Sequence, residues 1–385
     1  PSMAAETDAA AGKVEAAVRY QLEEVRVRGN RKTLDQVVLR HVPIKTGEYF
    51  SADDERLESM RYRLLVLGLF SEVRVTLRRG SARGQVMLDI AVVERNTIVV
   101  RDLTFGLTRI APDWDQIVPF GSLGVEERSF LGTGVALGAG VAASRDQVAY
   151  NIYLSDRHFL DSKFGLHVEG IYAEASESFG EHYLPGPIAE NAFGRYEQLD
   201  YRRAGIRLGS GYNLLADYFF WFDYRFENIV TDEPVVVEGG IYQDPTRDEP
   251  VVRGFLEPDA SALSAFLFGF QRDTTNHPVM PFDGSSSELS ITISSPVLGS
   301  SYNYAKFLLQ HRQYIPFGRR GQSICLSGIA GLITGTAPFF EQFFVGDFSS
   351  LVPDRRLGLN FSNLHPRVLN AAIVDVWYED MVLSL

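Results

Sequence analysis

The residue types that perform catalysis are present in this sequence, but their spacing forms no recognisable active site. The seven histidines are scattered, and none belongs to an HExxH motif or to an i, i+4 pair on a predicted helix. They are His41, His158, His167, His182, His277, His311 and His365. The sequence contains neither a GxSxG elbow nor a P-loop. We therefore predict no catalytic residues, no metal site and no cofactor.

Other chemistry-bearing residues also have a structural interpretation. The glycines at 132, 134, 138 and 140 do not follow the GxGxxG spacing of a nucleotide loop, and they suit curved strands better. Cys325 is the single cysteine, which excludes an intramolecular disulfide and a cysteine-built zinc site. The acidic stretches 174–190 and 244–249 are either calcium ligands or solvated loop carboxylates.

The composition excludes some classes of partner and leaves others open. The chain has 385 residues and a formal net charge of -12, which disfavours nucleic acid as a ligand. No run reaches the ~18 apolar residues that a membrane-spanning helix needs. The mean hydropathy of -0.06 fits a soluble protein. It fits a membrane β-barrel equally well, because barrel strands alternate apolar and polar residues.

The elements that position these residues change in character near residue 97. Residues 1–20 are small and Ala-rich, and we expect a flexible leader there. Residues 21–96 predict a compact unit of one strand, two helices and two strands. Thr33 is the expected N-cap of the first helix and Ser51 that of the second, and Gly68 is expected to end the second helix.

From residue 97 onward the sequence predicts about eleven strands of roughly ten residues each, the length of a tilted membrane strand. Their expected ranges are 99–109, 119–129, 133–143, 147–156, 163–174, 199–212, 217–228, 262–272, 285–297, 302–315 and 322–335. Aromatic residues cluster at 218–226, as in the interfacial girdle of a membrane barrel. Short turns alternate with long loops. This pattern favours a membrane β-barrel, with a soluble all-β fold as the alternative.

Residues 21–96 resemble a POTRA domain, the periplasmic β-α-α-β-β module. The resemblance depends on Val25-Arg26-Val27-Arg28-Gly29-Asn30, on Gly47, and on Leu67-Gly68-Leu69-Phe70-Ser71-Glu72-Val73. The last segment is similar to the "LGYFxxV" segment of that module. The resemblance implies a small α+β domain in the periplasm.

Residues 97–385 resemble the barrel of the bacterial surface antigen (BamA-type) family. Four stretches carry the resemblance and occur in the family's order. They are Phe130-Leu131-Gly132-Thr133-Gly134, Asp156-Arg157-His158-Phe159-Leu160, Arg272-Asp273-Thr274-Thr275-Asn276-His277-Pro278 with Pro281-Phe282-Asp283-Gly284, and Pro338-Phe339-Phe340-Glu341-Gln342-Phe343-Phe344-Val345-Gly346. The resemblance implies an antiparallel transmembrane β-barrel in the outer membrane of a Gram-negative-type bacterium.

The family also implies a lumen loop with an arginine at its tip. The loop motif corresponds here to Pro338, Phe339, Glu341, Phe343, Gly346 and Asp347. The family's "RGF" tripeptide is expected just after this motif, but Arg253-Gly254-Phe255 lies upstream of it, in another loop. The nearest substitute is Arg355 or Arg356, unless these form a solvated basic pair beside Asp354.

The length departs from the family pattern as well. The family barrel has sixteen strands, and this sequence contains about eleven to twelve of them before Leu385. Because an open barrel leaves unpaired backbone groups in lipid, we expect either that the sequence ends before the barrel is complete or that another chain supplies the closing strands.

The resemblance implies a role in outer-membrane protein assembly rather than an enzyme activity. Such a factor recognises unfolded client barrel proteins and inserts them by pairing their strands with its own open seam. The expected partners are outer-membrane lipids, client barrel proteins and accessory assembly proteins, and no nucleic acid. The first barrel strand is expected to form one side of the seam, with Val99, Val100, Arg101, Asp102, Leu103, Thr104, Phe105, Gly106 and Leu107. The alternative is a dedicated polypeptide secretion channel of the two-partner type.

Overall fold

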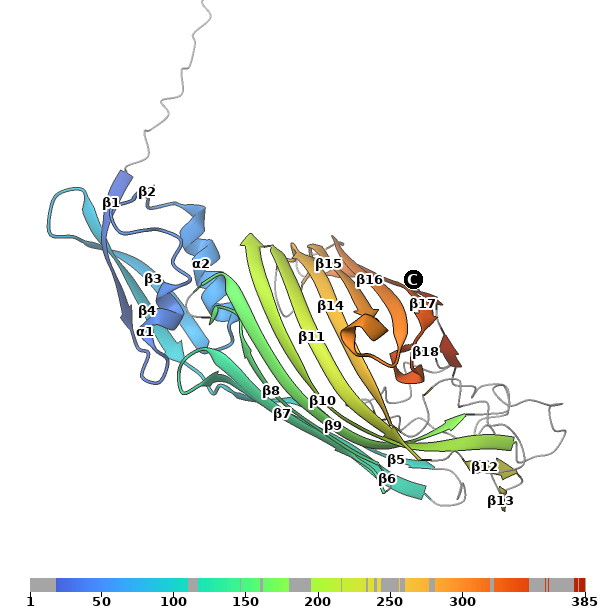
Figure 1. The fold of residues 1–385 in the computed structure, drawn as a ribbon. Coiled ribbons are helices and arrows are strands. Elements are labelled where there is room, and N and C mark those ends of the chain that lie inside the picture. Colours follow the sequence, from blue (N-terminus) through green and yellow to red (C-terminus); the bar gives the residue numbers. More distant parts are fainter. Residues whose placement is uncertain are drawn as a thin grey trace, which may run out of the picture. The chain divides into compact units, whose positions relative to one another are not determined.

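The protein divides into two compact units. The computed structural model describes residues 19–109, 117–145, 147–159, 162–179, 195–215, 217–232, 235–238, 241–243, 256, 260–276, 281–318, 322–345, 357, 359, 377–379 and 381–384. The first unit comprises Pro1–Asn96 with the turn Leu131–Thr133, and the second comprises Thr97–Phe130 with Gly134–Leu385 (Figure 1).

The first unit is a four-stranded mixed sheet with two helices. Its elements are β1 (Arg19–Arg28), α1 (Asp35–Leu39), β2 (Tyr49–Ser51), α2 (Glu55–Val66), β3 (Phe70–Arg79) and β4 (Gln85–Glu94). The strand order is β2-β1-β4-β3, and only the β1–β4 pair is parallel. Met60 and Leu64 of α2 are fully buried against Leu22, Leu88 and Ile90 of the sheet. The predicted small α+β unit is confirmed, with one additional short strand, β2.

The predicted ends of the two helices are only partly correct. Gly68, with φ 70°, follows the C-cap of α2 as predicted, because glycine adopts this left-handed conformation without a steric penalty. The predicted N-caps are wrong. Asp54, not Ser51, caps α2 by accepting a hydrogen bond from the Arg56 amide, while Ser51 belongs to β2. Leu34 precedes α1, and Thr33 instead donates its amide to Glu94.

Glu94 makes the stability of the first unit dependent on pH. Its carboxylate accepts hydrogen bonds from the amides of Thr33 at 2.7 Å and Lys32 at 3.0 Å. Burial alone would raise the pKa of Glu94, but these hydrogen bonds outweigh burial and hold the pKa below its usual value. The stabilisation is therefore present above the pKa of the unfolded chain and is lost as the pH falls through the lower folded pKa.

We expect Glu94→Gln to flatten this acid dependence. The variant should be less stable near pH 7, because it lacks the carboxylate that accepts these hydrogen bonds. It should lose less stability on acidification, because the amide side chain cannot be protonated in this range. Hydrogen exchange of residues 86–92 in the full chain, corrected for intrinsic rates between pH 3 and 7, measures this. Glu55→Gln, on the exposed first turn of α2, is the control. Equal acid dependence in wild type and Glu94→Gln would contradict the prediction.

The second unit is a large antiparallel sheet, and Figure 1 shows its strands side by side in a curved wall. Twelve strands follow one path, in the order β20-β17-β16-β15-β14-β11-β10-β9-β8-β7-β6-β5. They are β5 (Ile98–Arg109), β6 (Ile117–Phe130), β7 (Val135–Ala143), β8 (Val148–Asp156), β9 (Phe164–Phe179), β10 (Arg195–Leu215), β11 (Tyr218–Thr231), β14 (Ala260–Asp273), β15 (Gly284–Ser294), β16 (Asn303–Pro316), β17 (Ser323–Thr336) and β20 (Met381–Ser384). The predicted antiparallel sheet is confirmed. No helix among the described residues is long and apolar enough to cross a membrane.

Short elements accompany this path. They are β12 (Val235–Glu238) and β13 (Ile241–Gln243), which extend from β10, the 3-10 helices η4 (Pro296–Leu298) and η5 (Phe339–Glu341), and the pair β18 (Phe343–Val345) and β19 (Trp377–Glu379). The hairpin of β9 and β10 is longer than predicted. Its pairing continues to Phe179 and Glu197.

The two faces of this sheet differ in chemistry. On β11 the alternate residues Phe220, Phe222 and Phe226 are 40–41% exposed, while Arg225 and Glu227 on the opposite side are buried. We call the side with the phenylalanines the outer face and the side with Arg225 and Glu227 the inner face. A wall with exposed apolar side chains on one face and charged side chains on the other fits lipid contact outside and a polar interior.

Candidate functional site

The predicted loop motif packs onto the inner face through Phe339. Pro338 precedes the short helix η5, and the Phe339 side chain is fully buried. The Phe339 ring meets the Tyr201 ring of β10 edge to face, with the centroids 5.3 Å apart. Phe340 stacks on the same tyrosine at 6.3 Å, and the Arg203 guanidinium lies 3.8 Å from the Phe340 ring centroid. This segment therefore has an apolar and cation–π contact with the sheet.

Glu341 links the same segment to two further strands. Its carboxylate lies 2.6 Å from Nη1 of Arg225 on β11. Lys306 of β16 donates a hydrogen bond from Nζ to the Glu341 carbonyl at 2.6 Å. Arg225 in turn contacts Glu227, which Arg203 also binds through Nε at 2.9 Å and Nη2 at 2.7 Å. We call Arg203, Arg225, Glu227, Lys306 and Glu341 the anchor cluster.

Phe343 continues the contact onto β17. An added Cβ at Gly331 would lie 2.3 Å from the Phe343 ring, so the ring occupies the space that a side chain at 331 would need. Lys306 Nζ lies 5.0 Å from the centroid of the same ring. Glycine at position 331 therefore permits the close approach of Phe343 to the sheet.

The structure brings together three of the predicted loop residues, Phe339, Glu341 and Phe343. Gly346, Asp347, Arg355 and Arg356 lie outside the described residues, as does Arg253-Gly254-Phe255. Four members of the anchor cluster were not predicted, namely Arg203, Arg225, Glu227 and Lys306. The signal that could have found them is alternation, since Arg225 and Glu227 flank Phe226 on a strand whose other face is aromatic.

The predicted seam strand, β5, lies at one end of the sheet. Among the described residues it pairs with β6 alone, and β20 ends the sheet on the other side. Its outer side chains are the exposed residues Leu103, Phe105 and Leu107, with Phe105 84% exposed. Val100 pairs with Val125 and Asp102 with Gly124, so Arg101 is an extra residue in a β-bulge. Bulges are common at sheet edges.

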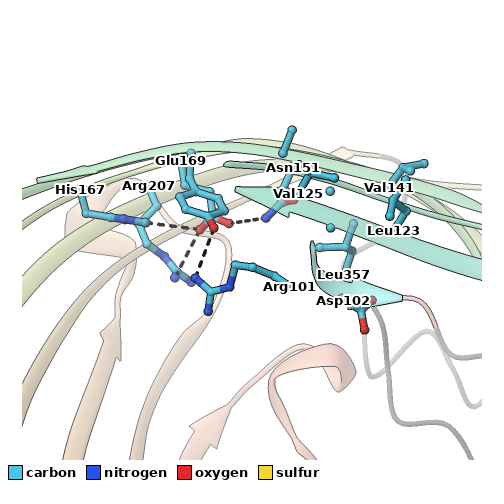
Figure 2. A pocket seen from close by; sticks show the side chains of 14 residues that line it. Arg101, Asp102, Leu123, Val125, Val141, Asn151, His167, Glu169, Arg207 and Leu357 are labelled. Carbon is cyan, nitrogen blue, oxygen red and sulfur yellow. Dashed lines mark hydrogen bonds and ion pairs between the residues drawn. The ribbon is translucent and has the colours of Figure 1, made fainter. Parts of the chain in front are cut away.

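A cavity of about 400 Å³ opens on the inner face beside β5. Figure 2 shows side chains from neighbouring strands around it, among them Arg101, His167, Glu169 and Arg207. Glu169 accepts a hydrogen bond from Asn151 at 3.0 Å and lies 3.5 Å from Nη1 of Arg207 and 3.7 Å from Nε2 of His167. Leu357 also lines the cavity. The cavity is thus lined by both signs of charge.

These groups do not form a metal centre or a catalytic constellation. Among the described residues, no three or more His, Cys, Asp or Glu side chains are grouped so as to hold a metal ion. The described site instead consists of a loop fixed to the inner face, a sheet edge, and a cavity beside that edge whose lining combines apolar and charged side chains.

Two family models match the chain. The Omp85 superfamily domain matches residues 129–351, more than half of the sequence, and a POTRA model described as a surface antigen variable number repeat matches residues 20–95. Together with the fold, these matches define a transmembrane β-barrel protein with an N-terminal POTRA domain. The chain belongs to the Omp85 superfamily.

Solved structures share this fold at low sequence identity. BamA from Haemophilus ducreyi lacking POTRA domains 1–3 is 18% identical with a TM-score of 0.54, and the match covers 86% of this chain and 59% of that chain. CdiB from Escherichia coli is 12% identical with a TM-score of 0.54, covering 85% and 56%. The chain therefore spans less than two thirds of the length of either protein.

Proteins of the Omp85 superfamily are non-enzymatic transport and assembly proteins of the outer membrane. The barrel unit lies in the outer membrane and the POTRA unit in the periplasm. Client polypeptides are the general partners of the superfamily. The outer face of the sheet, with Phe220, Phe222 and Phe226, accordingly faces lipid.

Proposed function

We propose that this protein inserts client β-barrel proteins into the outer membrane by pairing their strands with the edge of β5. The observation that supports this is the position of β5 at the end of the sheet, paired with β6 alone among the described residues. An edge strand offers a row of backbone N–H and C=O groups to another chain. In lipid each unsatisfied backbone group costs several kcal/mol, so pairing with this edge strongly stabilises a client strand.

The POTRA unit supplies a second edge of the same kind. The ten-residue strand β3 pairs with β4 alone among the described residues and borders that sheet. An extended client segment can add to β3 by the same backbone hydrogen bonds before it reaches the membrane. In this proposal no nucleotide or other cofactor is needed, because strand pairing and apolar burial drive insertion. Accessory assembly proteins remain part of the proposal.

We also propose that Arg355 or Arg356 is the lumen-loop arginine. Leu357 directly follows Arg356 in the chain and lines the inner-face cavity. Asp102 and Glu169 line the same cavity. A guanidinium can form two parallel hydrogen bonds to a carboxylate and keeps its charge at any physiological pH. Arg355→Ala and Arg356→Ala, made separately, are expected to identify which of the two is required for assembly.

We expect photo-crosslinking residues at Leu103 and Phe105 to capture nascent barrel proteins in living cells. Both outer side chains lie on the β5 edge and are exposed. The matched control is Leu289, an exposed outer-face residue of β15 in the middle of the sheet, where both sides are paired. Client crosslinks at 103 and 105 but not at 289 would support the proposal, and their absence at all three positions would sink it.

A secretion channel is the second candidate, and the charged inner face favours it. A lumen lined by Arg101, Glu169 and Arg207 is polar enough for an unfolded chain to pass. The similarity to CdiB, at the same TM-score as that to BamA, shows the fold alone and does not decide between the two. Depletion is the discriminating experiment: loss of an assembly factor lowers many barrel proteins, whereas loss of a channel affects one exported partner.

A further inference from the structure

Arg101 lies at the point where the edge strand is irregular. The bulge places Arg101 and Asp102, which are consecutive in the chain, on the same inner face of β5. A regular strand would direct one of them outward. Because of the extra residue, the edge strand makes two polar contacts with β6 at the same position along the strand.

The first contact spans several strands. Nη1 of Arg101 lies 2.7 Å from Oε2 of Glu126 on β6, and Glu126 is buried. The hydroxyl of Tyr153, on β8, donates to the same oxygen at 2.5 Å, and Arg101 lies 3.3 Å from that hydroxyl. Arg101 of β5 and Tyr153 of β8 thus meet at the Glu126 carboxylate, which also lies 3.4 Å from Nε of Arg128 on β6.

Gly138 of the intervening strand β7 makes this contact possible. An added Cβ at Gly138 would lie 2.2 Å from Cζ of Tyr153, so the tyrosine ring crosses β7 directly over this glycine. The register agrees, because Gly138 pairs with Tyr153 on one side and with Glu126 on the other. An alanine at 138 would force the ring away from Glu126.

The second contact is local. Ser122 of β6 donates a hydrogen bond from its hydroxyl to Asp102, and Thr104 donates to the same carboxylate at 3.3 Å. Beyond this point β5 continues to Arg109, with Leu103, Phe105 and Leu107 on its outer face. Two polar side-chain contacts of β5 with β6 thus lie at the bulge.

We infer that Arg101 is a positioning residue, which together with Glu126 and Tyr153 forms a latch that holds the β5 edge against the wall and sets how readily it opens to an incoming strand. This inference rests on the proposed function, because it assigns the control of the edge that accepts the client. The latch is reversible, since Arg101 is half exposed and water can replace its contacts when the edge moves.

Hydrogen exchange of the full chain in lipid bilayers tests the latch. We expect Arg101→Gln to raise the exchange rates of residues 99–107 about three- to tenfold. This is the effect expected from the loss of one partly screened, charge-assisted hydrogen bond. Arg101→Lys should restore part of the protection, because lysine can reach Glu126 without forming the arginine's fork.

The controls separate the latch from general destabilisation. Arg312→Gln removes an exposed inner-face arginine from β16 and should leave residues 99–107 unchanged. Tyr153→Phe removes only one hydroxyl and should raise exchange in the same strand by a smaller factor. Rates at 99–107 within twofold of wild type in both Arg101→Gln and Tyr153→Phe would overturn the latch.

Client crosslinking at Phe105 in the same variants distinguishes the two proposals. Faster exchange together with altered crosslinking yield supports both. Faster exchange without any client crosslinks, in wild type or variant, supports the latch and overturns the assembly role. Client crosslinks that are identical in wild type and Arg101→Gln, with unchanged exchange, overturn the latch and leave the assembly role standing.

Discussion

Replacing Glu341 with glutamine is expected to destabilise the folded barrel by about 3–5 kcal/mol, the usual cost of removing one partner from a buried ion pair. The anchor cluster holds three cations, Arg203, Arg225 and Lys306, and two carboxylates, Glu227 and Glu341. Without Glu341, only Glu227 would balance them. Arg225 is buried and cannot recover its hydration, so the loss of its partner at 2.6 Å is not compensated.

The midpoint of urea unfolding in lipid vesicles measures this effect. Glu174→Gln, an exposed carboxylate of β9, is the matched control and should change stability by less than about 0.5 kcal/mol. A double-mutant cycle with Arg225→Gln should show strong coupling, because the second substitution removes the guanidinium that lost one of its two carboxylate partners in the first. Additive effects of the two substitutions would show that the pair does not act as a unit.

Replacing Phe339 with alanine is expected to release the 338–345 segment from the inner face. The side chain is fully buried, and truncating such a phenylalanine costs about 3–5 kcal/mol when the cavity cannot collapse. The segment can undock instead of unfolding the whole sheet, so the loss of global stability is limited to the free energy of docking. Faster proteolysis within this segment, with an unfolding midpoint of the sheet no lower than in Glu341→Gln, would identify undocking, because undocking also separates Glu341 from Arg225.

The matched control for Phe339 is Phe307 of β16. It is 40% exposed on the outer face, so Phe307→Ala removes a ring of the same size without opening an internal cavity. We expect Phe307→Ala to leave proteolysis of the 338–345 segment at the wild-type rate. Equal proteolysis rates in both variants would contradict a specific anchoring role for Phe339.

The fold was predictable because it depends on the local periodicity of apolar and polar residues along the sequence. Alternation between aromatic and charged residues at 218–227 defines the two faces of β11 without any knowledge of its neighbours. The end of α2 at Gly68 was predictable for the same reason, since a left-handed residue after a helix favours glycine. The N-cap of α2 was not, because Ser51 and Asp54 both have suitable side chains and the short strand β2 excludes the serine.

The site was only partly predictable. The loop motif named Phe339, Glu341 and Phe343, which the structure brings together on the inner face, and the predicted seam strand included Arg101. Their counterparts lie far away in the chain, as Arg225 does from Glu341, so no local pattern connects them. The bulge at Arg101 likewise depends on the register of β5 against β6, which alternation alone does not fix.

By itself, the sequence determined the class of this protein: a POTRA unit followed by an antiparallel wall with an apolar and a polar face. Both depend on side-chain periodicity and turn residues, which act over a few positions. Only the tertiary structure decided which inner-face charges meet, namely Glu341 with Arg225 and Arg101 with Glu126. The physical reason is that strand register sets these distances, and register is fixed by the pairing of whole strands rather than by any single segment.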